Sequence, residues 1–248
     1  MDESMKIFYE LHEKLPRQGP GDSTSTAKAY RLASSLPETP RILDVGCGSG
    51  IQTIELAKLS GGTVTGLDNH RPFLDKLLSE AAKSGLTGQI EAVEGAMEEL
   101  PFKEESFDLI WSEGAIYIMG FEKGLAEWKR FLKPGGYISV SDMSWLVNPP
   151  PQEVLEYWQN EYPGLINVDE HLEIIEKQGY SPVGHFTLPA SSWWESYYNP
   201  TIEVLKNLKE KYIGNPALEP VLLETESEIE LFRNYSHSYG YVFYVMKF

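Results

Sequence analysis

Cysteine and basic side chains are both scarce in this sequence of 248 residues. The single cysteine, Cys47, excludes an internal disulfide and a metal site built from a cysteine cluster, and it fits a reducing cytoplasm. The five histidines show no metal-ligand spacing, so no metal is expected. Only 21 Lys and Arg stand against 37 Asp and Glu, and the net charge of −16 would repel nucleic acid or an anionic membrane.

Long apolar runs are also missing. No stretch approaches the roughly 18 continuous apolar residues of a membrane span, and the charged N-terminal stretch lacks the apolar segment of a signal peptide. We therefore expect a soluble, cytoplasmic protein. There is no internal repeat, and the length suits one large α/β domain or two small ones.

The local patterns predict alternating strands and helices from Arg41 onward. Residues 1–15 and 27–36 have helical spacing, and the Gly/Pro/Ser/Thr-rich stretch between them is typical of a loop. Short apolar strands are expected at 41–46, 63–68, 89–95, 107–111 and 137–142, with helices at 51–60, 72–85 and 121–132. This alternation predicts a parallel sheet with helices on both faces.

The regular alternation of predicted strands and helices ends after Asp142. Residues 143–167 are rich in Trp, Tyr and Pro and predict an insertion with a short helix. A helix over 169–179, a strand over 180–188, a mostly helical stretch over 191–236 and a final strand over 241–248 follow. We expect the last two strands to form the far edge of the same sheet.

The stretch "ILDVGCGSGIQT" carries the strongest signal, because Gly46, Gly48 and Gly50 separate a strand from a helix. Glycines there let backbone turn tightly and approach a ligand. Asp68 ends the next strand, where an acid can accept hydrogen bonds from ribose hydroxyls. A dinucleotide fingerprint would place its third glycine at position 51, and the carboxylate of Asp44 suits a ligand with an ammonium group better than a pyrophosphate.

Four motifs in order, "LDVGCGSG", "VTGLD", "LPF…SFDLIWSEGAIY" and "LKPGGYISVSD", make residues 41–142 resemble the class I S-adenosylmethionine-dependent methyltransferases. The resemblance implies an α/β, doubly wound Rossmann-like fold with a seven-stranded sheet, mostly parallel with the last strand antiparallel. It implies S-adenosyl-L-methionine as cofactor and a small-molecule methyl acceptor, as in the quinone-biosynthesis and small-amine methyltransferases. A homodimer is possible.

The resemblance also implies roles for individual residues around the cofactor. Gly46, Gly48, Gly50 and the backbone of Cys47 would hold the methionine part, with Asp44 near its amino group. Asp68 would hold the ribose, Asn69 and Met97 would flank the adenine, and Ser112 would lie near the sulfonium. Ala96 stands where many relatives have an Asp that accepts the adenine amino group, which leaves the purine contacts open.

Glu113 and Tyr117 follow the strand predicted at 107–111, and ligands of doubly wound sheets lie beyond such strand ends. Our hypothesis is that Glu113 orients or deprotonates the acceptor and that Tyr117 helps to position it. The alternative is that Glu113 is a favourable acid at a helix start. Arg17, in the loop before the first strand, is within reach of a carboxylate of cofactor or substrate.

Residues 1–248 are expected to form a single domain. Within it, 1–40 would be a helical lid, 41–142 the cofactor-binding core, and 143–167 and 190–238 insertions that cover the acceptor. The aromatic residues of the insertions would either line the acceptor pocket, even one for an amine, or form core.

The expected function is methyl transfer to an N, O or C nucleophile of a small molecule. The alternatives are a non-catalytic sensor or scaffold subunit that binds S-adenosylmethionine and, less favoured, an NAD-dependent oxidoreductase.

Overall fold

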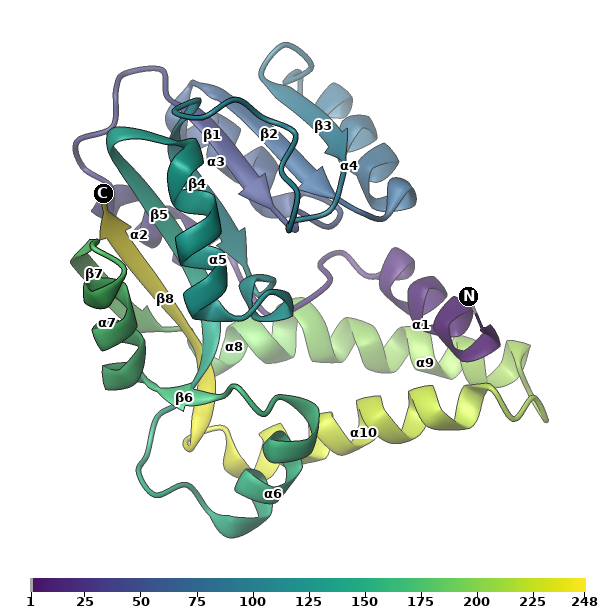
Figure 1. The fold of residues 1–248 in the computed structure, drawn as a ribbon. Helices are drawn as coiled ribbons and strands as arrows, with labels where there is room; N and C mark the ends of the chain where they lie inside the picture. The colour runs from purple at the N-terminus through teal and green to yellow at the C-terminus, as the bar shows by residue number, and fades with distance from the viewer. Residues whose placement is uncertain (1) are drawn as a thin grey trace.

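The computed structural model describes residues 2–248 as one sheet flanked by helices, with a helical arm beside it (Figure 1). Seven strands lie in the order β3-β2-β1-β4-β5-β8-β7. They are β1 (Arg41–Val45), β2 (Thr63–Asp68), β3 (Ile90–Glu94), β4 (Phe107–Glu113), β5 (Leu132–Trp145), β7 (Ser181–Thr187) and β8 (Tyr239–Lys247).

The strand directions confirm the predicted sheet. β1 to β5 pair in parallel, and β8 runs antiparallel to its neighbours β5 and β7. The seven strands therefore form a mostly parallel sheet whose last strand is antiparallel. A two-residue strand, β6 (Ile166–Asn167), pairs with the end of β5 outside this order.

Helices cover both faces because the strands bury side chains on both sides. Along β4, Leu109 and Trp111 pack with one layer of helices, while Ile110 packs with the other. The first layer holds α2 (Ser23–Leu32), α3 (Ile51–Ser60) and α4 (Arg71–Lys83), and the second holds α5 (Phe121–Trp128) and α7 (Val168–Lys177). This is the doubly wound arrangement that the alternation of strands and helices predicted.

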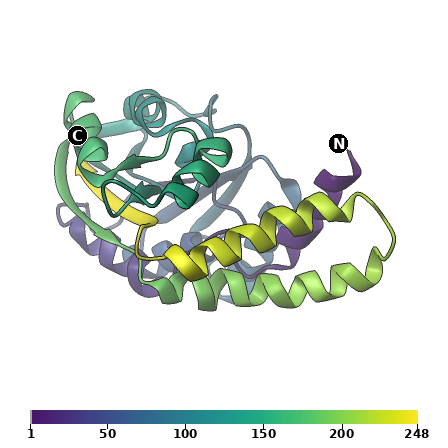
Figure 2. The same cartoon turned by 90° about the horizontal axis from the view of Figure 1, so that it is seen from below.

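An arm of three helices extends beside the carboxyl ends of the strands. It consists of α1 (Glu3–Lys14), α9 (Asn199–Lys211) and α10 (Leu218–Tyr235), joined by buried Ile7 and Leu11 of α1 packing with leucines of α9 and α10. Figure 2 shows α9 and α10 side by side and antiparallel, with α1 against them. The remaining helices are α6 (Gln152–Glu161), α8 (Ala190–Trp193), the 3₁₀ turns η1 (Ile116–Ile118) and η2 (Lys129–Phe131), and the π turn η3 (Trp194–Tyr198).

Some predicted boundaries were wrong. The helix predicted over 27–36 is α2, which starts at Ser23, because the side chain of Asp22 accepts a 2.8 Å bond from the backbone N–H of Ser25. Such a cap contributes about 1 kcal/mol and turns a Ser/Thr-rich stretch into a first helical turn. β5 extends to Trp145, three residues beyond the prediction, because β8 pairs with it as far as that residue.

None of the helices described between residues 2 and 248 combines the length and the apolar character that crossing a bilayer requires.

Candidate cofactor and acceptor site

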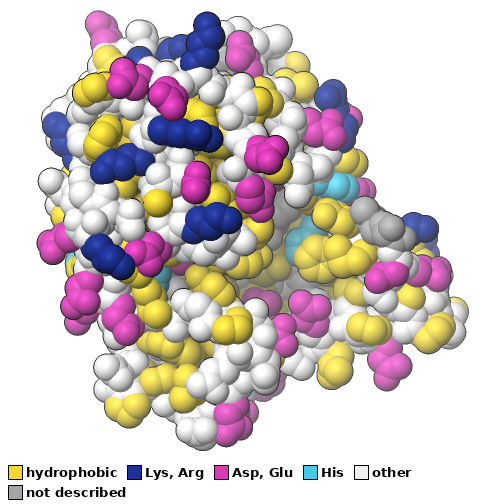
Figure 3. All heavy atoms as spheres, in the orientation of Figure 1, with side chains coloured by type: hydrophobic (Ala, Val, Ile, Leu, Met, Phe, Trp, Pro, Cys, Tyr) yellow, Lys and Arg dark blue, Asp and Glu magenta, His cyan; other side chains and the backbone are white. Residues whose placement is uncertain are grey.

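A cavity of about 410 Å³ lies between the carboxyl ends of the strands and the arm. Its sheet side carries residues that follow or end β1, β2, β4 and β5, and its far side carries residues of α1, α6, η3 and α10. Figure 3 shows this face of the molecule hollowed between the body and the arm, with acidic side chains near the lower rim. The carboxyl edge of a doubly wound sheet is where such folds bind ligands.

The glycine loop after β1 approaches its neighbours too closely for side chains. Gly46 and Gly48 have φ of +70° and +53° and line the cavity. A Cβ on Gly46 would lie 2.5 Å from the Cβ of Ala115, and one on Gly48 would lie 2.5 Å from Oε1 of Gln18. Both glycines therefore hold backbone open toward the cavity, as the sequence predicted for a ligand loop.

Gly50 packs against Leu77 and does not line the cavity. It caps α3 with φ of +78°, and a Cβ there would lie 2.2 Å from a methyl carbon of Leu77. Cys47 lines the cavity but is buried, and burial raises the pKa of its thiol well above the ordinary value. Cys47 is thus an unreactive thiol, which agrees with a packing role.

Asp68 lies at the end of β2 on the cavity wall. Its two carboxylate oxygens accept bonds of 2.9 Å from the backbone N–H groups of Gly48 and His70. Burial raises its pKa, and these two bonds oppose that rise. Each oxygen keeps a further lone pair, so the carboxylate stays able to accept hydroxyl donors.

Asp44 lies beneath the loop and is not among the described residues that line the cavity. Its Oδ2 accepts a 2.6 Å bond from the hydroxyl of Thr53, while its Oδ1 is buried without a partner within residues 2–248. Burial raises the pKa of Asp44 to about 7, and the charge of Glu113 adds to the rise. The carboxylate is therefore costly until a positive group reaches it.

We expect this carboxylate to make the ligand-free protein less stable as the pH rises. The pKa of Asp44 is raised from 3.8 to about 7 in the folded state. Its favourable contribution to the free energy of unfolding is therefore fully present below about pH 4 and is lost by the time the pH has passed 7. Between pH 5 and pH 8 the Tm of the wild type should fall by roughly 5–10 °C relative to Asp44→Asn, which keeps the bond from Thr53. Scanning calorimetry of both proteins at several pH values checks this, and parallel profiles would contradict it.

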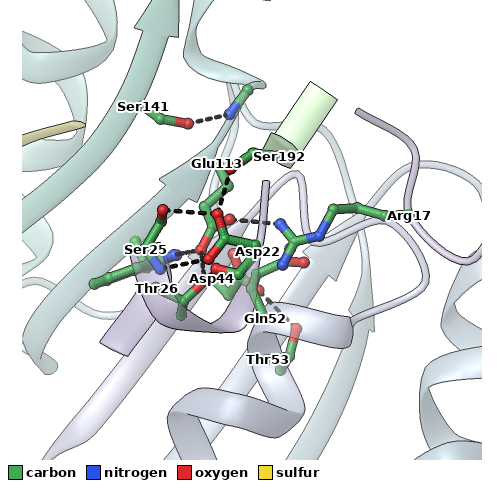
Figure 4. A network of polar contacts seen from close by, with 12 residues as sticks. Arg17, Asp22, Ser25, Thr26, Asp44, Gln52, Thr53, Glu113, Ser141 and Ser192 are labelled. Atoms are coloured by element: carbon green, nitrogen blue, oxygen red, sulfur yellow. Dashed lines mark hydrogen bonds and ion pairs between the residues drawn. The ribbon is translucent and has the colours of Figure 1, made fainter. Parts of the chain in front are cut away.

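Glu113 lies in a buried ion pair with Arg17, 96 residues away in sequence (Figure 4). Nη1 of Arg17 donates to Oε2 of Glu113 over 2.5 Å, and the side chains are only 7% and 3% exposed. Oε1 of Glu113 accepts from the hydroxyl of Thr26 at 2.8 Å and the indole N–H of Trp111 at 3.0 Å. Arg17 neutralises the charge of Glu113, and Oε1 already accepts two hydrogen bonds, so the geometry favours a structural anchor over a proton acceptor.

The segment that carries Arg17 closes over the glycine loop. Oε1 of Gln18 accepts from the backbone N–H of Ser49 at 2.7 Å, and the hydroxyl of Ser49 donates to the carbonyl of Pro16 at 3.1 Å. Residues 16–18 thus connect the arm, the loop and the end of β4. These contacts suit the lid expected for residues 1–40, which stays a prediction.

The other residues predicted from the sequence divide between the cavity and the core. Asn69, Met97, Glu113 and Tyr117 line the cavity, whereas Ala96 and Ser112 lie off its wall among the residues described. Ser112 is fully buried with no hydrogen-bond partner for its hydroxyl within residues 2–248. Direct cofactor contacts at Ala96 and Ser112 therefore find no support in the geometry.

Sequence reasoning missed Asp142, the last residue of the predicted fifth strand. It lies in β5, is fully buried, and lines the cavity. Its Oδ2 lies 3.1 Å from the hydroxyl of Tyr162 and 3.3 Å from Nε2 of His171, while Oδ1 has no partner within the described chain. The position of Asp142 at the end of a predicted strand could have identified it as a candidate site residue. His171 has no such signal, because a single histidine in a helix forms no local pattern.

Eight aromatic side chains, all after residue 116, line the cavity and are called the aromatic wall below. They are Tyr117, Tyr157, Trp158, Tyr162, Trp193, Tyr197, Tyr198 and Tyr241. Trp145 and Trp194 pack instead in the adjoining core cluster. Both sequence-based alternatives for these aromatics therefore hold in part.

Among residues 2–248, no cluster of three or more His, Cys, Asp or Glu side chains is arranged to hold a metal ion.

Comparison with known proteins shows what this chain is similar to. Residues 42–136 match a family model described as a methyltransferase domain. The sterol 24-C-methyltransferase erg-4 of Neurospora crassa is 34% identical over 184 residues, which cover 68% of this chain and 48% of that protein. A SAM-dependent methyltransferase from Geobacter sulfurreducens, solved with S-adenosyl-L-homocysteine, has a TM-score of 0.83 at 20% identity over 97% of both chains. YjhP from E. coli has a TM-score of 0.84 at 19% identity over 97% of this chain and 98% of that one.

A glycine loop after β1, an acid at the end of β2 and this strand order define an α/β methyltransferase fold. Residues 42–136 therefore carry a methyltransferase domain, and the chain has the fold of SAM-dependent methyltransferases that were solved with S-adenosyl-L-homocysteine. The chain spans about half the length of erg-4 and 28% of ERG6A of Gibberella zeae. The family match ends at residue 136, so Asp142 and all of the aromatic wall except Tyr117 lie outside it.

The residues at the sheet side of the cavity fit this cofactor. Nη2 of Arg17 is buried in the wall without a partner among the residues described, and a guanidinium suits a carboxylate. Asp68 suits hydroxyl donors, and the unpartnered Oδ1 of Asp44 has the charge that suits an ammonium, although Asp44 lies beneath the loop and not on the cavity wall. Gly46 and Gly48 line the cavity with backbone, because a Cβ at either position would clash with Ala115 or Gln18.

Proposed function

We propose that this chain transfers a methyl group from S-adenosyl-L-methionine to a nucleophilic N, O or C atom of a small-molecule acceptor. One observation carries the proposal: a single cavity joins the glycine loop and Asp68 at one end to Asp142 and the aromatic wall at the other. A cofactor and an acceptor would therefore meet inside one cavity.

The cofactor, when bound, supplies an electrophilic methyl group on a sulfonium. The chain's own part is to hold both molecules and exclude water, since most of the catalysis of a displacement comes from orientation. We assign the methionine end to the glycine loop and Arg17, the ribose to Asp68, and the adenine to the wall around Asn69 and Met97.

An acceptor that carries a proton also needs a base. Glu113, the residue that the sequence suggested, is neutralised by Arg17, whereas Asp142 on the neighbouring strand lines the cavity and has one buried oxygen without a partner among the residues described. We therefore propose Asp142 as the proton acceptor, oriented by Tyr162 and His171, and Glu113 as the anchor of Arg17. Tyr117, which packs edge-to-face on Tyr162 at 5.7 Å, would position the acceptor.

Calorimetric titration with S-adenosylhomocysteine tests the cofactor half of this proposal. Asp68→Ala removes the carboxylate that faces the ribose and should weaken binding by roughly 100-fold. Glu94→Ala, an exposed acid at the end of β3, is the matched control and should bind like the wild type. Equal affinity of both variants would contradict the assignment of Asp68.

A turnover screen against amines, phenols, quinols and apolar alkenes tests the acceptor half. A carbon acceptor is the second candidate because the sterol 24-C-methyltransferase erg-4 is among the relatives. Cofactor binding without turnover on any class would favour the sensor or scaffold alternative. The net charge of −16 supports a small molecule over nucleic acid, and the single Cys47 suits a cytoplasmic location.

A further inference from the structure

The charge of the cavity is strongly one-sided. Seven carboxylates line it, namely Asp68, Glu98, Glu113, Asp142, Glu161, Glu224 and Glu228, and Arg17 contributes the guanidinium. Arg17 is already paired with Glu113, so it does not offset the remaining acids. A cavity with this balance would repel an anionic acceptor such as a phosphate ester.

The histidine on this wall does not add positive charge. Nδ1 of His12 lies 2.8 Å from the carbonyl of Phe8 and must donate to it. Burial lowers the pKa of His12, so the ring is neutral near pH 7. Its Nε2 faces the hydroxyl of Tyr197 at 3.4 Å, and it contributes a polar but uncharged surface.

Three of the acids crowd one another on α6 and α10. Burial raises the pKa of Glu228 to about 7, and the charges of Glu224 and Glu161 add to the rise. Oε1 of Glu228 accepts a 2.7 Å bond from the hydroxyl of Tyr198, but no hydrogen bond reaches Oε2 from within residues 2–248. Like charges that are held together without a cation destabilise the folded protein. Costly arrangements of this kind are typical of binding sites.

Aromatic rings line the same cavity as the carboxylate of Glu228. Burial first, and the charge of Glu228 after it, raise the pKa of the phenol groups of Tyr117 and Tyr197. Tyr117, Tyr197 and Tyr241 line the same cavity as Glu228, and Tyr198, next to Tyr197, donates the hydrogen bond to Oε1 of Glu228. Rings of this kind attract cations through their faces.

A second, independent feature points to a ligand. Asp142 is 0% exposed and lines the cavity, and its Oδ1 is buried without a hydrogen-bond partner in the described chain. A buried oxygen of this kind costs free energy unless a ligand donates to it. The acidic wall of α6 and α10 and the free oxygen on β5 thus border one space.

We infer that the acceptor carries a positively charged amine, which the carboxylate of Glu228 and the rings of Tyr117, Tyr197 and Tyr241 recognise, with the free oxygen of Asp142 facing it. This inference rests on the proposed function and narrows its acceptor to small molecules that join an amine to an apolar or aromatic body.

A matched pair of probes isolates the effect of charge. Benzyl(2-hydroxyethyl)dimethylammonium and 3,3-dimethyl-4-phenylbutan-1-ol have the same shape and differ by a positive nitrogen in place of a carbon. Calorimetric titration of each into the wild-type protein saturated with S-adenosylhomocysteine should give at least tenfold tighter binding of the ammonium probe.

Glu228→Gln should reduce this preference at least fivefold and leave the affinity for S-adenosylhomocysteine unchanged. Glu219→Gln, an exposed acid in the first turn of the same helix, is the control and should keep the full preference. The variant is expected to fold, because the carboxylate it removes is crowded by like charges.

The outcomes separate the two proposals. Equal or tighter binding of the neutral probe, binding of neither probe, or a preference that survives in Glu228→Gln would overturn the amine inference while the cofactor still binds. Failure of S-adenosylhomocysteine itself to bind would instead overturn the proposed function.

Discussion

Glu113→Gln is expected to lower the free energy of unfolding by about 3–5 kcal/mol, because it leaves the guanidinium of Arg17 buried without its counter-charge. In a domain of this size the Tm should fall by roughly 6–15 °C. Cofactor affinity should fall as well, since Arg17 holds residues 16–18 over the glycine loop. Thermal denaturation and titration with S-adenosylhomocysteine measure both effects.

A double-mutant cycle gives the control. Arg17→Gln combined with Glu113→Gln removes both charges and should be more stable than Glu113→Gln alone. Glu122→Gln, which breaks an exposed pair with Lys177, should change little. If Glu113→Gln keeps the wild-type Tm and cofactor affinity but loses turnover, the original hypothesis that Glu113 acts on the acceptor is correct and the anchoring role is not.

Asp142→Asn should lower kcat by about 10²–10⁴ with the acceptor that the turnover screen identifies, because an amide cannot take up a proton. Binding of S-adenosylhomocysteine should stay within roughly threefold of the wild type, since we assign Asp142 to the acceptor and not to the cofactor. Steady-state kinetics over a range of pH, together with titration, separate the two quantities.

Two further variants sharpen this result. His171→Gln removes the ring that lies 3.3 Å from Asp142, and it should shift the pH profile of kcat while leaving part of the activity. Asp108→Asn, at the opposite end of β4, should leave kcat unchanged, because its carboxylate pairs with Lys133 far from the cavity. Full activity of Asp142→Asn would show that this carboxylate takes no proton.

The cofactor half of the site was predictable because its signals are local. Gly46 and Gly48 lie in one short loop, and Asp68 ends the next strand, so spacing along the chain placed them at one edge of the sheet. The same local spacing could not show that Gly50 would face Leu77 and leave the cavity wall. Nor could it reveal that Asp22 would cap α2 and move the start of that helix.

The acceptor half depended on segments far apart in sequence. The sequence left open whether Tyr197 and Tyr198 form core or line the cavity, because the answer depends on how η3 and α10 pack. Glu228 had no distinguishing context in an acidic helix, and only folding placed it beside Tyr198. A long helix with several acids shows nothing in its sequence about which of them faces a cavity.

The sequence by itself determined the strand and helix alternation, the parallel sheet and the loop that defines the family, because these depend on residues within a few positions of one another. The tertiary structure decided what each carboxylate does. Glu113 is neutralised by Arg17 across 96 positions, while Asp142 lines the cavity and has one buried oxygen without a partner among the residues described. The role of an acid is set by which charges and donors surround it once the chain has folded, and those partners come from distant segments.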